Sequence, residues 1–155
     1  MNTVASVDIN APPSAVFPWI HDRERLRQWL PSIESDEVIE EKPGHVGTRF
    51  KQVYKEGKRR IEMEGEITAW EQDRRLGVFL WCPYFEMKLD YTLEPTGDAT
   101  RLTQRGDMRF KGFMRLFGCM APLMRKKAQR QIEAELTKLK GLCEAEAGRQ
   151  AGVME

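Results

Sequence analysis

Histidine and cysteine are scarce in this chain of 155 residues. His21 and His45 are its two histidines, whereas a protein metal site needs several His, Cys or carboxylate ligands at recognisable spacing. The three cysteines are widely spaced and odd in number, so no disulfide framework is predicted. We therefore expect neither a metal ion nor a cofactor, and the cysteine usage favours a reducing, cytoplasmic setting.

Long apolar runs, a signal peptide and a phosphate-binding loop are also missing. No segment approaches the roughly 18 apolar residues of a membrane-spanning helix, so we expect no integral membrane association. The first residues lack the charged and apolar regions of a secretory signal, and there is no glycine-rich phosphate loop. The net charge is only +1, and no basic strand carries interleaved aromatic residues, so nucleic acid is not an expected partner.

The composition is that of one globular domain, with 41% hydrophobic and 32% charged residues. Alternation over residues 3–9 predicts a first strand. Pro12 and Pro13 then suit the entry to a short helix. Asp22 is a favourable N-cap for a second short helix over residues 23–29.

From residue 34 to about residue 108 the apolar residues recur with a period of two. Turns of hairpin length separate the apolar runs, which is typical of an antiparallel sheet with one solvated face. Glu62, Glu64 and Glu66 occupy that solvated face of the clearest strand. The predicted strands are 35–41, 48–54, 61–69, 76–82, 85–93 and 100–108.

A long amphipathic helix is predicted from Phe113 to Ala147, because its apolar residues recur every three or four positions. Gly118 and Pro122 predict a kink or break near its beginning. Residues 148–155 show no pattern, and we expect a flexible tail after a single domain of residues 1–147. A long helix with one apolar face needs an apolar sheet to pack on, which indicates an α+β fold.

This order of elements resembles the helix-grip superfamily, often called SRPBCC. That superfamily includes START lipid-transfer domains, birch-pollen allergens and polyketide cyclase/dehydrase-like proteins. The resemblance covers residues 3–146 and is strongest with the polyketide cyclase/dehydrase-like branch. It implies a curved sheet of about seven strands around the long helix, with a deep apolar cavity that opens near the short helices. The residues that carry the resemblance are Val7 to Phe17, Trp29 to Pro31, Gly47 to Phe50 and Thr100 to Thr103.

Candidate cavity residues follow from the strand alternation and from the Met/Phe-rich beginning of the long helix. Gln52, Gln104 and Tyr54 share the phase of apolar neighbours, so their side chains either bond to neighbours or orient a ligand. The apolar candidates are equally what an ordinary core requires. No residue is predicted to be catalytic. The candidates are Trp29, Phe50, Gln52, Tyr54, Met63, Trp81, Phe85, Met87, Gln104, Met108, Phe113, Phe117, Met120 and Met124.

Three functions fit these observations. The first is binding of a hydrophobic small molecule or lipid-like ligand in the cavity. The second is a cyclase or dehydratase acting on an aromatic or polyketide-type substrate, which rests on the resemblance and the inward polar residues. The third is a protein-interaction role similar to that of chaperone activators, because residues 101–130 are strongly basic, although a solvated helix face would look the same. The oligomeric state is open between monomer and homodimer.

Overall fold

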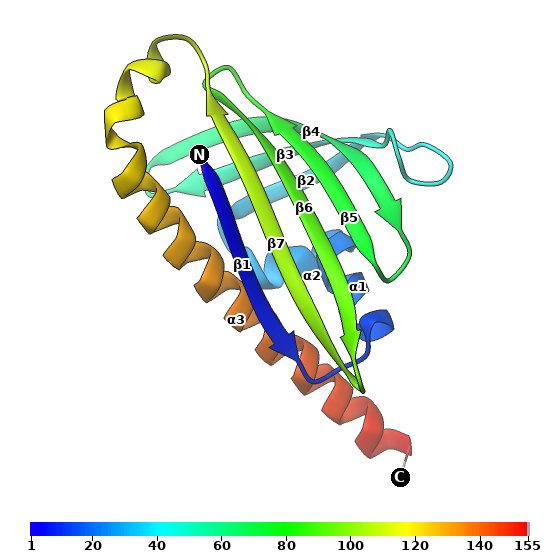
Figure 1. Ribbon diagram of the computed structural model, residues 1–155. Helices are drawn as coiled ribbons and strands as arrows, with labels where there is room; N and C mark the ends of the chain where they lie inside the picture. The colour runs from blue at the N-terminus through cyan, green and yellow to red at the C-terminus, as the bar shows by residue number, and fades with distance from the viewer. Residues whose placement is uncertain (155) are drawn as a thin grey trace.

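Seven strands form one antiparallel sheet that curves around a long helix (Figure 1). The computed structural model describes residues 1–154, apart from the side chains of Phe117, Val153 and Met154. This arrangement confirms the α+β helix-grip fold that the sequence predicts. The strands are β1 (Asn2–Ile9), β2 (Ile33–Glu40), β3 (Arg49–Glu56), β4 (Arg59–Glu71), β5 (Arg75–Trp81), β6 (Phe85–Thr96) and β7 (Ala99–Phe110).

The strands lie in the order β1-β7-β6-β5-β4-β3-β2, so β1 pairs with the last strand of the sheet. Thr3 lies opposite Gly106, and Ala5 lies opposite Gln104. The register shifts between Ile67 and Ala69 on β4, and such irregularities increase the local twist of a strand. A twisted sheet of this length has a concave face, and that face turns toward the helices.

Two short helices, α1 (Pro13–His21) and α2 (Arg23–Trp29), connect β1 to β2. Asp22 separates them, and its side chain accepts hydrogen bonds from the backbone N–H groups of Glu24 and Arg25 at 3.0 and 3.2 Å. This is the N-cap that the sequence predicts. The cap fixes the direction of α2, which places Arg23 beside the sheet.

The predicted break near Pro122 is confirmed. A 3₁₀ helix, η1 (Gly112–Met120), precedes the long α-helix α3 (Ala121–Met154), and Pro122 lies in the first turn of α3, where its missing N–H costs nothing. The α-helix continues through residues 148–154, so it is longer than the sequence predicts. No helix within residues 1–154 is long and apolar enough to cross a membrane.

Most of the buried core lies between the concave face of the sheet, α1, α2 and the second half of α3. Trp29 is fully buried, and its indole N–H donates to the backbone carbonyl of Trp19 at 2.9 Å. A second, smaller apolar cluster on the sheet consists of Phe50, Met63, Leu80 and Cys82. The core therefore has two parts, and the candidate site lies where they meet.

Candidate ligand-binding site

A cavity of about 290 Å³ lies between α3 and the concave face of the sheet. Its floor is made by β4, β6 and β7, and its cover comes from Ala128, Ile132 and Glu135 on one face of α3. Those three residues recur at helical spacing, so they share that face. The apolar lining residues are Met1, Leu30, Ile61, Met63, Phe85, Met87, Leu89, Met108, Ala128 and Ile132.

A second, smaller cavity of about 70 Å³ adjoins the first, on the side of α1 and α2. Phe50, Leu76 and Leu80 contribute apolar wall to it, and Arg23, Asp36 and Gln52 contribute polar wall. The two cavities share part of their wall, because four side chains line both. The shared residues are Leu30, Tyr54, Leu89 and Tyr91.

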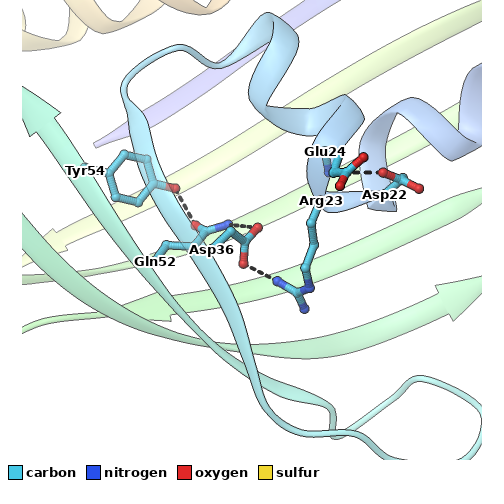
Figure 2. A network of polar contacts seen from close by, with 6 residues as sticks. All are labelled: Asp22, Arg23, Glu24, Asp36, Gln52 and Tyr54. Carbon is cyan, nitrogen blue, oxygen red and sulfur yellow. Dashed lines mark hydrogen bonds and ion pairs between the residues drawn. The ribbon is translucent and has the colours of Figure 1, made fainter.

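A chain of polar contacts runs along the wall of the smaller cavity (Figure 2). The Tyr54 hydroxyl donates to Oε1 of Gln52 at 2.7 Å, and Nε2 of Gln52 donates to Asp36 at 3.1 Å. Asp36 also forms an ion pair with Arg23, and its side chain is only 1% exposed. Gln52 and Tyr54 come from β3, Asp36 from β2 and Arg23 from α2. The amide of Gln52 therefore has a fixed orientation, and the single hydrogen of the Tyr54 hydroxyl is already used.

Tyr54, Tyr91 and Glu135 are titratable groups that line the larger cavity and have shifted pKa values. Burial, together with the nearby charges of Asp36 and Glu135, raises the pKa of Tyr54 above its ordinary value. Burial likewise raises the pKa of Tyr91. Both phenols therefore stay protonated at neutral pH and act in hydrogen bonding rather than as bases. Burial also raises the pKa of Glu135, against a hydrogen bond from Gln131 at 3.0 Å that lowers it.

Gln104 has a buried polar atom without a partner. Its residue is 6% exposed, it lines the larger cavity, and it lies opposite Tyr91 on β6. Within residues 1–154, no donor reaches its Oε1 atom. Buried polar atoms in folded proteins are nearly always hydrogen bonded, and an exception at a cavity wall suggests a group that a ligand completes.

The structure brings most of the predicted cavity residues together. Phe50 and Gln52 line the smaller cavity, and Tyr54 lines both. The others that the structure places on the larger cavity are Met63, Phe85, Met87, Gln104 and Met108. The alternation of apolar and polar positions in β3, β4, β6 and β7 therefore predicts their direction correctly.

Five predicted residues line neither cavity. Trp29 belongs to the closed core, where its ring meets the edge of Tyr91. Trp81 lies on the outer face of the sheet, where its indole N–H donates to Glu64 at 3.1 Å. The near-continuous apolar run of β5 conceals which residues alternate inward, so sequence alone did not show that Trp81 turns outward.

The other three belong to the beginning of the helical region. Phe113 and Met120 are exposed, and Met124 is half-buried outside both cavity walls. The 3₁₀ conformation of η1 has three residues per turn, so an apolar stripe that follows the α-helical period does not stay on one face there. The side chain of Phe117, which was also predicted, lies outside the described residues.

Sequence reasoning missed several polar groups of the site. Tyr91 shares the inward phase of Leu89 on β6, so the strand alternation already contained this signal. Glu135 follows Ala128 and Ile132 at helical spacing, but a charged residue on an amphipathic helix is ordinarily expected on the solvated face. Asp36 lies opposite Gln52, beyond a register shift in β2 that changes the phase of that strand.

No three His, Cys, Asp or Glu side chains in the described part of the chain lie close enough to hold a metal ion. The polar groups that line the cavities include two phenols, three amides, three carboxylates and the basic side chains of His21, Arg23 and Lys55, in a mostly apolar wall. Such a wall can hold an apolar molecule and position it by hydrogen bonds.

Comparison with known proteins gives a family and several similar folds. The family model for "Polyketide cyclase / dehydrase and lipid transport" matches residues 2–144. A solved protein from Thermus thermophilus is 25% identical over 94% of this chain and 98% of its own, with a TM-score of 0.74. Among the curated proteins, no relative matches.

Two further solved structures show the same fold at lower identity. A START superfamily protein from Mycobacterium smegmatis is 16% identical over 93% of this chain and 97% of its own, with a TM-score of 0.77. The Zhui aromatase/cyclase from a Streptomyces species is 14% identical over 93% of each chain, with a TM-score of 0.76. At these identities the likeness concerns the fold alone.

Proposed function

Since the chain belongs to the polyketide cyclase/dehydrase and lipid transport family, we propose that it binds an apolar small molecule between α3 and the concave face of the sheet. The observation that carries this proposal is the cavity of about 290 Å³, whose wall is mostly apolar. Ligand sites typically measure roughly 300–1,000 Å³ and combine an apolar wall with a few placed polar groups. The smaller cavity of about 70 Å³ adjoins it and adds room for part of a ligand.

The polar groups of the wall favour a ligand that carries a hydroxyl group. Gln104 offers an unpaired Oε1 atom. The Tyr54 oxygen still has lone pairs, because its hydrogen is donated to Gln52, and Glu135 offers a carboxylate. These groups accept hydrogen bonds, so a hydroxyl on the ligand would find an acceptor, whereas a carboxylate would meet the charge of Glu135.

A matched pair of ligands tests this preference. β-Naphthol and its methyl ether have similar apolar rings, but only the naphthol can donate a hydrogen bond. We expect the protein to bind β-naphthol about tenfold more tightly by calorimetry, because a hydrogen bond to a buried group contributes roughly 1 kcal/mol or more. In a Gln104→Leu variant this difference in affinity should become smaller, because Tyr54 and Glu135 are then the remaining acceptors. Equal binding to the unaltered protein would contradict the hydroxyl preference while leaving apolar binding intact.

Identification of a natural ligand needs no assumption about its structure. Native mass spectrometry of the purified protein, followed by denaturing extraction, would reveal any compound that copurifies. An apolar compound with a hydroxyl group is the expected result. A copurified fatty acid or other carboxylate would contradict the proposed ligand class, because its charge would lie near the Glu135 carboxylate, whereas Lys55, which also lines this cavity, is exposed.

Cyclase or dehydratase activity is the second candidate, and the polar chain from Tyr54 to Arg23 is the observation that favours it. Fixed donors and acceptors beside a cavity can orient a substrate carbonyl, and Glu135, with its raised pKa, is a plausible proton donor. A Glu135→Gln variant separates the two functions. Loss of turnover of a polyketide-type substrate with unchanged affinity would support catalysis, whereas a pure binding protein shows no turnover in either form.

A further inference from the structure

The η1 segment and the first turn of α3 expose large apolar side chains at one end of the molecule. The exposed fraction is 65% for Phe113, 80% for Leu116, 48% for Met120 and 69% for Leu123. Single exposed apolar residues are ordinary, but a group of them on one short segment indicates an interaction site. In Figure 1 this segment, drawn in yellow, lies beyond the end of β7.

The same segment is basic. Every charged residue between Asp107 and Glu133 is a lysine or an arginine. Arg109 lies 3.9 Å from Asp107, and Lys111 lies 3.7 Å from Glu86. The four cations near the beginning of α3 differ, since no carboxylate within residues 1–154 lies at ion-pair distance from them. These cations are Arg125, Lys126, Lys127 and Arg130.

Helical spacing places the apolar and basic residues on a common face. Lys126, Lys127 and Arg130 follow Leu123 by three, four and seven positions, so all four lie on one side of α3, and all four are exposed. Ala128 and the cavity-lining residues after it occupy a different side of the helix. The beginning of α3 therefore has a face that covers the cavity and a second face that is apolar at its start and cationic beyond.

We propose that this second face, together with the exposed side chains of η1, docks on the surface of an anionic lipid bilayer. Apolar side chains flanked by lysine and arginine are the pattern of helices that lie in a membrane interface, and anionic headgroups attract such cations. Phe113, Leu116, Met120 and Leu123 project from a helical surface and line neither cavity. Such projecting side chains suit insertion between lipids better than they suit binding of a peptide. The proposal is independent of what the cavity binds.

Cys119 provides a probe within η1, next to Met120. It is exposed, whereas Cys82 and Cys143 are buried, so a thiol-reactive fluorophore can be attached selectively. An environment-sensitive dye such as NBD fluoresces more strongly and at shorter wavelength in an apolar interface. We expect that change with vesicles of phosphatidylcholine and phosphatidylglycerol, and little change with phosphatidylcholine alone.

Two sets of substitutions test the contribution of the surface in a vesicle cosedimentation assay. Replacement of Lys126, Lys127 and Arg130 by glutamine should weaken binding to the anionic vesicles about a hundredfold. Replacement of Leu116 and Leu123 by serine should weaken it roughly tenfold or more. All five residues are exposed, so the variants should fold, which circular dichroism would verify.

A matched control removes the same charge elsewhere. Arg74, Lys138 and Arg149 are exposed cations outside the surface, and their replacement by glutamine should change vesicle binding only a few-fold. An equal loss in this control and in the Lys126, Lys127 and Arg130 variant would overturn the proposal, because binding would then depend on net charge alone. Failure of the protein to bind anionic vesicles would overturn it as well. Binding to soluble polyglutamate without vesicle binding would instead identify an acidic protein partner.

Discussion

Gln52 and Gln104 both project from the concave face of the sheet into adjoining cavities, but they differ in their hydrogen bonds. Gln52 accepts from Tyr54 and donates to Asp36, at 2.7 and 3.1 Å. Oε1 of Gln104 receives no hydrogen bond within the described part of the chain. Both residues are buried, with 4% and 6% exposure. The Gln52 amide therefore links Tyr54 to Asp36 in the cavity wall, whereas Oε1 of Gln104 is available to a ligand.

Substitution of these two glutamines by leucine should have opposite effects on stability. Gln52→Leu leaves the Tyr54 hydroxyl and the buried Asp36 carboxylate with fewer partners, which should lower the free energy of unfolding by about 2–3 kcal/mol. Gln104→Leu removes an unsatisfied buried group and should raise it by about 1 kcal/mol. Urea denaturation of the ligand-free proteins measures both changes. Equal destabilisation by the two substitutions would show that the Gln104 amide is satisfied in solution.

Glu135 should make stability depend on pH. Its pKa in the folded protein is raised by burial above the ordinary value of 4.5, so the folded state holds this proton more tightly than the unfolded state does. The contribution of Glu135 to the free energy of unfolding is therefore most favourable below pH 4.5. It falls as the pH rises from 4.5 through the pKa that Glu135 has in the folded protein, and above that pKa it stays constant. Glu135→Gln removes the buried charge and keeps an acceptor for Gln131.

Near neutral pH the free energy of unfolding should consequently be higher for Glu135→Gln than for the original protein. At acidic pH the free energies of unfolding of the two proteins should become equal. Urea denaturation across this pH range provides the measurement. Lys55 and Glu56 also line the larger cavity, but their side chains are exposed and are the same in both proteins. A constant difference between the two proteins at every pH would contradict the assigned role of burial.

Gly65 and Gly141 should respond to alanine in opposite directions. A Cβ atom at Gly65 would lie 2.4 Å from the Phe50 ring and 2.8 Å from Leu80, so Gly65→Ala forces these side chains apart and should cost about 1–3 kcal/mol. A Cβ atom at Gly141 meets nothing within 4 Å on α3, so Gly141→Ala should stabilise the protein by about 0.5–1 kcal/mol.

Thermal unfolding measures both glycine substitutions. For a chain of this size, 1 kcal/mol corresponds to a shift of roughly 2–4 °C in Tm. Gly65→Ala should also reduce ligand binding if a ligand occupies the smaller cavity, because Phe50 and Leu80 form part of its wall. An increase in Tm for Gly65→Ala would show that the Phe50 ring moves aside without cost.

Much of the fold follows from local patterns in the sequence. The period-two segments correspond to strands β2 to β7, the Asp22 cap begins α2, and Pro122 lies at the beginning of α3. These features depend on residues close together in the chain, so sequence reasoning can reach them. The direction of Gln52, Tyr54 and Gln104 follows from the same alternation.

The beginning of the helical region and the outer face of β5 could not be predicted in this way. An apolar period shows that a helix has an apolar face, but not what covers that face, and Phe113 and Met120 are in fact exposed. The outward direction of Trp81 depends on the register with β4, which places it opposite Glu64. Both outcomes depend on how distant segments meet.

The cavity under α3 is the proposed ligand site, and replacement of two alanines on that helix by tryptophan tests this proposal most directly. Ala128 lines the larger cavity, whereas Ala134 is exposed on the same helix. Tryptophan at position 128 would fill the cavity, and the same change at position 134 would not. The neutral dye N-phenyl-α-naphthylamine, which fluoresces in apolar surroundings, reports binding to each folded variant.

We predict that Ala128→Trp weakens dye binding at least about tenfold, since burial of a few CH₂ groups already accounts for such a change, while Ala134→Trp binds the dye as tightly as the original protein. Circular dichroism and thermal unfolding should verify that both variants fold, with Ala128→Leu as a smaller substitution for the cavity. Equal dye binding by the two tryptophan variants would contradict the account, because the ligand site would then lie elsewhere.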